Sequence, residues 1–256
     1  MRRVAVVSHG KPETLGDAAA RFERLVRELG VEVDDEDPDL AVVLGGDGTM
    51  LRALQRFLGT GVPVLGVNFG RVGFLTSIAG KGFEPGLRRA LGGELRVLEL
   101  PTLDAECGET HVTAVNDVVA TSGTIGRLVE VEWTIGGEAM GAVRCDGVIC
   151  CTPSGSTGYN LSAGGAVLMW GMDAIGVTFV APHSLHTRTI VVPRGLEIAV
   201  RNATPDVPLA LIADGHRVGD VSPGERVSVS LGEQRSLLAT LPEATFVRRY
   251  RETFAT

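Results

Sequence analysis

A glycine-rich segment that contains one carboxylate is the part of this chain whose residue types most directly indicate chemistry. It reads Gly45-Gly46-Asp47-Gly48-Thr49. Glycine lets the main chain approach a ligand closely, and the free N–H groups at the start of a following helix suit a phosphate. Asp47 would repel a bare phosphate, so it needs another task there, such as accepting a hydroxyl proton or binding a metal ion. The pattern predicts a phosphotransfer site. The alternative is a tight turn in which Asp47 caps the helix.

Strand-like and helix-like segments alternate around this turn. Apolar runs predict strands at residues 3–8, 40–44 and 63–67, and residues 83–91 have the spacing of a short helix. Two further helical stripes consist of Phe22, Leu25, Val26 and Leu29, and of Met50, Leu51, Leu54 and Leu58. This alternation with short connections predicts an α/β domain with a parallel sheet over residues 1–93. Ligands bind beyond the carboxyl ends of the strands in such sheets, which is where Asp47 would lie.

The pattern changes after Gly92-Gly93. Apolar and polar residues alternate over residues 129–135 and 227–231, which is typical of half-buried strands. Many short strands between glycine and proline turns predict a β-rich, sandwich-like second domain over residues 94–242. Helical spacing returns near the C-terminus, with an apolar stripe of Phe246, Val247, Tyr250 and Phe254. A lone amphipathic helix must bury its stripe, so we expect residues 243–256 to pack back on the first domain.

A second polar segment, Thr152 to Gly165, follows the apolar run Gly147 to Cys151. Its hydroxyls and free N–H groups suit phosphate, ribose or the edge of an adenine ring, and Tyr159 can stack on a planar ring. The alternative is a flexible, serine-rich loop. Tyr159 and Leu161 argue against that alternative, because a fully solvated loop seldom needs such side chains. The segment is therefore interpreted as a ligand-binding loop.

Asn116 and Asp117 form a third candidate, with apolar residues on both sides. A neighbouring amide and carboxylate supply the donor and the acceptor that two adjacent sugar hydroxyls need. Without further context, an ordinary Asn-Asp turn is the favoured interpretation. Asp146, next to Gly147, is equally ambiguous.

The segment from Pro182 to Arg188 carries two histidines, His183 and His186, three residues apart. No third metal ligand is placed by spacing, so packing or contact with substrate is favoured over a metal site. Arg188 suits either a phosphate or an internal carboxylate, and the sequence does not choose.

Composition excludes several classes of function. The net charge of −7 argues against general affinity for nucleic acid, which needs a basic face. No apolar run approaches the ~20 residues that span a bilayer, and the N-terminal residues predict no secretory leader. We therefore expect a cytoplasmic protein without membrane partners. The four cysteines lack paired zinc-site spacing and are predicted to be buried free thiols.

Taken in order, these segments resemble the NAD kinase family. The resemblance comprises Gly45 to Thr49, Asn68-Phe69-Gly70-Arg71-Val72-Gly73-Phe74, Asn116-Asp117, Asp146-Gly147, Thr152 to Gly165, Pro182-His183 and Asp214-Gly215. It runs from about residue 40 to 215, and the joint pattern is far more specific than any one segment. It implies phosphorylation of the 2′-hydroxyl of the adenosine ribose of NAD, giving NADP. ATP is the expected donor, polyphosphate is accepted by some members, and a divalent cation (Mg²⁺) is expected. The family resemblance also implies the two-domain fold and a homodimer or homotetramer.

The resemblance further implies roles for single residues. Asp47 is the expected base near the 2′-hydroxyl, and Gly48 and Phe74 are expected to flank the bound NAD. Asn116 and Asp117 are expected to hold the ribose hydroxyls, and Asp146 to approach the nicotinamide half. The adenine pocket is expected to be lined by Thr157, Gly158, Tyr159 and Ser162. The phosphate donor is expected on Gly45, Gly46, Gly48 and Thr49. No role is transferred to His186, Arg188, Asp214 or His216.

This sequence departs from the family pattern at three positions. The family usually has glutamate where Asp117 stands, and Asp117 keeps the carboxylate on a side chain one methylene shorter. It usually has threonine and alanine where Ser154 and Gly158 stand, and Gly158 is expected to loosen the adenine pocket slightly.

Two rival functions remain open on the residues. Lipid and sugar kinases carry similar glycine-aspartate turns, but this acidic chain shows no membrane-facing apolar or basic patch. Asn116, Asp117 and Tyr159 favour a nucleoside acceptor. A non-catalytic dinucleotide-binding sensor is the other rival, and the intact Asp47 argues against it.

Overall fold

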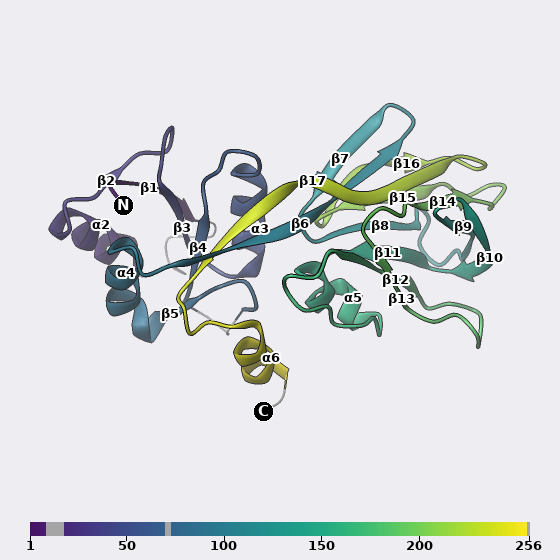
Figure 1. The fold of residues 1–256 in the computed structure, drawn as a ribbon. Helices are drawn as coiled ribbons and strands as arrows, with labels where there is room; N and C mark the ends of the chain where they lie inside the picture. Colours follow the sequence, from purple (N-terminus) through teal and green to yellow (C-terminus); the bar gives the residue numbers. More distant parts are fainter. Residues whose placement is uncertain (9–17, 70–72, 255–256) are drawn as a thin grey trace. The chain divides into compact units, whose positions relative to one another are not determined.

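The computed structural model describes residues 1–8, 18–69 and 73–254. The chain divides into two compact units, the first of Met1–Glu99 with Arg235–Thr256 and the second of Leu100–Gln234 (Figure 1). Gly70, Arg71 and Val72 of the predicted pattern lie outside the described residues.

The first unit contains the predicted parallel sheet. Its strand order is β2-β1-β3-β4-β5, and every neighbouring pair is parallel. β3 and β4 are buried along their whole length, so both faces need apolar residues and the sequence shows continuous apolar runs. The strands are β1 Arg3–Ser8, β2 Glu32–Val33, β3 Leu40–Leu44, β4 Val64–Asn68 and β5 Ile78–Ala79.

Helices cover this sheet. α2 and α4 share one hydrophobic core with the strands through Phe22, Leu25 and Phe83, and Figure 1 shows α3 on the other side of the sheet. α2 is shorter than predicted, because Leu29 lies beyond its end and is 38% exposed. The bounds are α2 Ala18–Glu28, α3 Asp47–Arg56, the 3₁₀ turn η1 Gly80–Gly82 and α4 Phe83–Leu91.

The C-terminal helix α6, Phe246–Phe254, returns to the first unit as predicted, but of the predicted stripe only Phe246 is half-buried. Val247, Tyr250 and Phe254 are 63%, 40% and 42% exposed. The residue that α6 buries is Arg249. The prediction missed Arg249 because apolar spacing says nothing about a polar side chain that docks through hydrogen bonds.

The second unit consists of two antiparallel sheets, in agreement with the predicted β-rich sandwich. One sheet has the order β13-β12-β11-β8-β15-β16, and the other contains β10-β9-β14-β17 and the hairpin β6-β7. One hydrophobic core takes side chains from both sheets, for example Val131 of β9 and Val148 of β11. β6 and β17 have residues in both units, and β17 pairs in parallel with β4.

The bounds of the first of these sheets are β8 Asp117–Ser122, β11 Gly147–Cys151, β12 Ala174–Val180, β13 Ile190–Pro193, β15 Leu209–Ala213 and β16 His216–Val221. The other strands are β6 Arg96–Cys107, β7 Thr110–Ala114, β9 Val129–Ile135, β10 Glu138–Cys145, β14 Ile198–Asn202 and β17 Arg226–Thr240. Two short helical turns follow β11, namely η2 Gly155–Thr157 and α5 Tyr159–Ser162.

Among the described helices, none is long and apolar enough to cross a membrane. The four cysteines are buried and unpaired, as predicted. Burial raises the pKa of the Cys145 and Cys150 thiols to about 12, so these thiols stay protonated at neutral pH.

Candidate active site

The glycine turn lies where the sequence predicted it, at the carboxyl end of a parallel strand. β3 ends at Leu44, Gly46 is the N-cap, and α3 begins at Asp47. The carbonyl oxygen of Gly46 accepts hydrogen bonds from the N–H groups of Thr49 and Met50, both 3.0 Å long. The alternative interpretation of Asp47 as the helix cap is therefore wrong.

Asp47 uses its carboxylate to bind a different segment of the first unit. Its Oδ2 accepts a hydrogen bond of 2.7 Å from the backbone N–H of Phe74, and its Oδ1 accepts one of 3.0 Å from the N–H of Leu75. The side chain is half-buried. Gly73 comes so close that a Cβ there would lie 2.8 Å from the Asp47 Cγ. The carboxylate is thus held in one orientation by the main chain and keeps part of its surface open.

Phe74 contributes its backbone here more than its ring. The ring is 5% exposed. It packs edge-on against Phe246, with 5.2 Å between centroids, and lies 6.1 Å from the ring of Phe254. Both partners belong to α6, so the C-terminal helix covers the residue that was expected to flank a dinucleotide.

Asn116 and Asp117 are fixed by a third carboxylate, that of Asp214. Its two oxygens accept hydrogen bonds of 2.7, 2.7 and 3.0 Å from the N–H groups of Val115, Asn116 and Asp117. Asp214 and Gly215 form the two-residue turn between β15 and β16, with φ of 47° and 81°. Such hairpin turns favour an Asp-Gly pair because both central residues need positive φ.

The electrostatics of Asp117 are unusual. The residue is 9% exposed. Burial raises the pKa of its carboxyl to about 7, and the nearby negative charge of Asp214 adds to the shift. Near neutral pH, Asp117 is therefore partly protonated and is able either to donate or to accept a hydrogen bond.

The segment from Thr152 to Gly165 is not a flexible loop. Thr152, Ser154 and Ser156 are no more than 2% exposed. Thr152 Oγ1 donates to the carbonyl oxygen of Val115 at 2.8 Å, and Ser154 Oγ donates to Oδ1 of Asn116 at 3.1 Å. These hydroxyls satisfy the buried backbone and side chain of the neighbouring segment.

The open face of this loop lies further along. Gly158, Tyr159 and Ser162 are exposed and Thr157 is half-buried. Tyr159 is 46% exposed, so a large part of the residue is accessible to solvent. The structure thus brings together, within the second unit, the Asn116-Asp117 pair, Asp214 and the loop that carries the predicted adenine-binding residues. Asp47 belongs to the first unit.

Asp146 is not among the residues that converge on Asp117. β8 and β11 pair Asp117 with Cys151 and Thr121 with Gly147, so Asp146 lies at the opposite end of the strand pair. At about 3.3 Å per residue, five residues along the strand separate the two backbone positions by about 16 Å. A role for Asp146 at the nicotinamide half stays a prediction.

The remaining polar candidates have internal contacts. Arg188 donates to the carbonyl oxygens of Leu185 and Thr187 at 2.8 and 2.9 Å. His216 Nδ1 lies 3.1 Å from the carbonyl oxygen of Asp214. No group of three His, Cys, Asp or Glu side chains suited to a metal ion occurs within the part of the chain that the structure describes.

Two domain families match most of the chain. Residues 6–94 match the ATP-NAD kinase N-terminal domain and residues 115–241 match the ATP-NAD kinase C-terminal domain. The NAD kinase of Gemmatimonas aurantiaca is 38% identical over 245 residues, which cover 93% of this chain and 82% of that protein. The NAD kinase of Nitratidesulfovibrio vulgaris is 34% identical over 272 residues, which cover 98% of this chain and 95% of that protein.

Solved structures agree with these relatives. An NAD kinase from Archaeoglobus fulgidus in complex with ATP is 27% identical and has a TM-score of 0.77, over 99% of this chain and 97% of that one. A yeast NADH kinase complexed with NADH has a TM-score of 0.88 over 100% of this chain and 88% of that one. Its identity is 23%, so it supports the fold alone. Because both domain families match in order and relatives above 30% identity span most of the chain, this protein belongs to the NAD kinase family and is an enzyme that phosphorylates NAD.

Proposed function

We propose that this enzyme transfers the terminal phosphoryl group of ATP to the 2′-hydroxyl of the adenosine ribose of NAD, with Asp47 as the catalytic base. The placement of Asp47 carries the proposal. The residue opens α3 directly after a glycine pair, and two backbone N–H groups orient its carboxylate. A carboxylate offers about four lone-pair sites, so one that binds two N–H groups is still able to accept a hydroxyl proton.

We assign the adenosine half of NAD to the second unit. Asn116 and Asp117 hold the ribose hydroxyls in this assignment, and Asp214 supports it because its carboxylate fixes their backbone. The adenine ring is assigned to the open face of the loop, where Tyr159 is available for stacking. The residues of that face are Thr157, Gly158, Tyr159 and Ser162.

ATP is the proposed donor. The family and the ATP complex of the archaeal NAD kinase support it, and inorganic polyphosphate is the alternative donor. We assign the donor phosphates to the N-terminal turn of α3, where the first N–H groups of a helix favour an anion. Gly48 and Thr49 lie in that turn, Gly46 is the N-cap before it, and Gly45 precedes the cap.

A Mg²⁺ ion fits this assignment if the substrate phosphates supply most of its ligands. The described residues offer no cluster of three ligating side chains, but Mg²⁺ is commonly held by one or two carboxylates and by substrate phosphates. Asp47 is the carboxylate on the turn. The ion, when bound with ATP, would neutralise charge on the transferring phosphate.

The chemical step asks little covalent work of the protein. The 2′-oxygen forms a bond to the terminal phosphorus, the bond from that phosphorus to the bridging oxygen breaks, and ADP leaves. Asp47 orients the hydroxyl and takes its proton as the new bond forms. Catalysis then consists mainly of positioning and of charge stabilisation by backbone donors.

We further propose that the enzyme is a homodimer or a homotetramer, which the family resemblance supports. We keep the expectations of a cytoplasmic location and of small-molecule substrates without nucleic-acid or membrane partners.

The Asp47→Asn variant tests the proposal. Its activity is measured as NADP formed from NAD, ATP and Mg²⁺, and a parallel series replaces ATP by polyphosphate. We expect kcat to fall at least ~10²-fold, because a positioned base contributes about 10²–10⁴-fold, while NAD still binds. The matched control is Asp35→Asn, an exposed aspartate of the first unit. Near-native turnover of Asp47→Asn would remove Asp47 from the mechanism.

A further inference from the structure

Arg249 is the one buried residue of α6, a helix whose other charged side chains are exposed. It is 3% exposed. Removing a charged side chain from water is expensive unless hydrogen bonds or opposite charges compensate. The hydrogen-bond partners of the Arg249 guanidinium therefore indicate its role.

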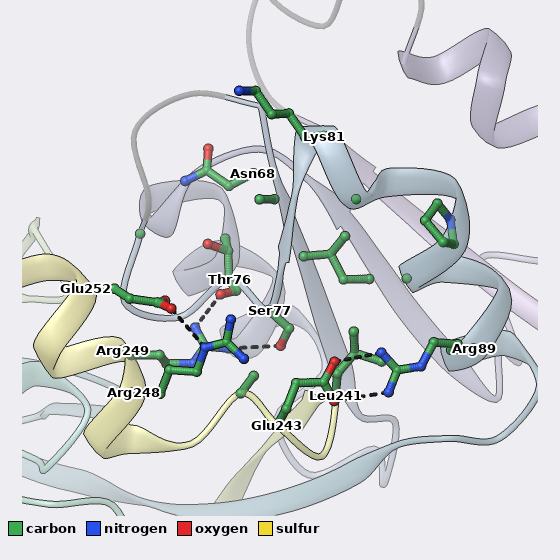
Figure 2. A pocket seen from close by; sticks show the side chains of 18 of the residues that line it. Asn68, Thr76, Ser77, Lys81, Arg89, Leu241, Glu243, Arg248, Arg249 and Glu252 are labelled. Carbon is green, nitrogen blue, oxygen red and sulfur yellow. Dashed lines mark hydrogen bonds and ion pairs between the residues drawn. The ribbon is translucent and has the colours of Figure 1, made fainter.

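The guanidinium binds the backbone of one short segment. It donates to the carbonyl oxygens of Phe74, at 2.6 Å, and of Thr76, and to Oγ of Ser77, at 3.0 Å. Figure 2 shows Arg249 beside Thr76 and Ser77, along a hollow of about 800 Å³ in the first unit. Charge-assisted hydrogen bonds of this kind are roughly twice as strong as neutral ones.

The same segment is the one that orients Asp47. Its N–H groups, those of Phe74 and Leu75, donate to the carboxylate, while its carbonyl oxygens accept from the guanidinium. The segment from Phe74 to Ser77 is thus fixed from its donor side by an anion and from its acceptor side by a cation. A shift of this backbone moves the carboxylate with it.

Burial and neighbouring charges both act on the Arg249 guanidinium. Burial lowers the pKa of the guanidinium to about 10. The negative charges of Asp47 and Glu252 oppose the shift, and the positive charge of Arg248 reinforces it. Arg248 and Glu252 themselves form an ion pair 2.8 Å long. Arg249 therefore stays charged at neutral pH, beside the carboxylate assigned as the base.

We infer that Arg249 is a positioning residue for Asp47, acting through the backbone of residues 74–77. The C-terminal helix then has a task in the reaction besides packing, since it carries the cation that sets the orientation of the carboxylate. This inference rests on the proposed role of Asp47 as the base.

Arg249→Met tests the inference, since methionine keeps much of the apolar length and removes the charge and all donors. Arg251→Met is the matched control, because Arg251 is an exposed arginine of the same helix. Phe246→Leu is a second control, which weakens the packing of α6 on Phe74 and leaves Arg249 itself unchanged. For each variant we would measure kcat, KM for NAD, the melting temperature and the exchange rate of the Phe74 and Leu75 amide hydrogens.

We expect Arg249→Met to lower kcat by about 10–10²-fold, the range for small misplacements of a catalytic group, with little change in KM for NAD. Both amides should exchange faster. Arg249→Lys should recover part of kcat, because it restores the charge with fewer donors. If Arg249→Met does not fold, Arg249→Lys carries the test, with an intermediate loss of kcat expected. Arg251→Met should behave like the unchanged enzyme.

A double-mutant cycle separates positioning from a purely structural role. If Arg249 acts through Asp47, then Arg249→Met should cost little further activity in the Asp47→Asn background. Equal losses in both backgrounds would overturn the inference. The inference would also be overturned if Arg249→Met lost no more kcat than a Phe246→Leu variant with the same melting temperature.

Near-native turnover of Asp47→Asn alone would overturn the proposed base and this inference together. An inactive Asp47→Asn with a fully active Arg249→Met would overturn this inference only.

Discussion

Replacement of Gly73 by alanine tests whether Asp47 must keep its present orientation. A Cβ at residue 73 would lie 2.8 Å from Cγ of Asp47 and 3.1 Å from Oδ2, and closer still to Oδ1. Ordinary contacts between carbon atoms are about 3.5–4.0 Å. Either the carboxylate or the backbone that binds it therefore has to move.

The expected magnitude follows from the two hydrogen bonds at stake. They are 2.7 and 3.0 Å long and join Asp47 to the N–H groups of Phe74 and Leu75. A hydrogen bond to a charged group contributes about 1.5–3 kcal/mol, and overpacking costs about 1–3 kcal/mol. Loss of one bond with partial relief of the clash predicts a destabilisation of about 2–4 kcal/mol. A displacement of about 1 Å near the reacting atoms predicts a fall in kcat of about 10²-fold.

Steady-state kinetics with NAD as the varied substrate and urea unfolding measure the two quantities. Gly82→Ala is the matched control, because a Cβ at Gly82 would have no atom within 4 Å. We expect the control to keep activity and to lose no more than about 1 kcal/mol, since Gly82 is the N-cap of α4. If Gly73→Ala were destabilised as calculated and yet turned over like the unchanged enzyme, the orientation of Asp47 would not matter for the reaction.

Two further predictions concern the second unit. Asp214→Asn is expected to raise KM for NAD and lower the melting temperature, because one amide oxygen replaces two carboxylate oxygens that accept three N–H groups; an unchanged KM would separate Asp214 from NAD binding. The pKa of Asp117, raised to about 7 by burial and by Asp214, means that the folded state binds its proton more tightly than the unfolded chain. Its contribution to stability is therefore full below about pH 4 and is lost as the pH rises to about 7, by at most about 4 kcal/mol. Asp117→Asn should flatten the stability of the enzyme over this range in urea unfolding at pH 4.5 to 8, and an unchanged slope would contradict the assignment.

The fold of the first unit was predictable because its local signals agree with its topology. Strands buried on both faces require continuous apolar runs, and the helix at residues 83–91 has the bounds that its spacing predicted. The return of α6 to this unit was also predicted. Its buried face was not, since a single arginine between aromatic residues gives no periodic signal that it will be the buried group.

The site was predictable in its residue types and not in its contacts. The turn at Asp47 was found from local sequence, but its partners are the N–H groups of residues 27 and 28 positions away. Backbone N–H groups occur at nearly every residue, so no sequence pattern distinguishes them. The contacts of the Thr152 and Ser154 hydroxyls, inside the predicted ligand loop, were not predictable for a related reason. They donate to the carbonyl oxygen of Val115 and the amide oxygen of Asn116. That these oxygens are buried and require donors is known only from the three-dimensional structure.

Asp47 and Asp214 show why orientation by the main chain does not by itself identify a base. Each carboxylate accepts hydrogen bonds from consecutive N–H groups of a distant segment. Asp214 is 6% exposed and binds three such groups, so most of its acceptor capacity serves the backbone. Asp47 binds two and remains half-buried, which leaves it both a fixed direction and an open face. A catalytic carboxylate needs both a fixed direction and an open face. The more N–H groups it binds, the fewer acceptor sites remain on that open face.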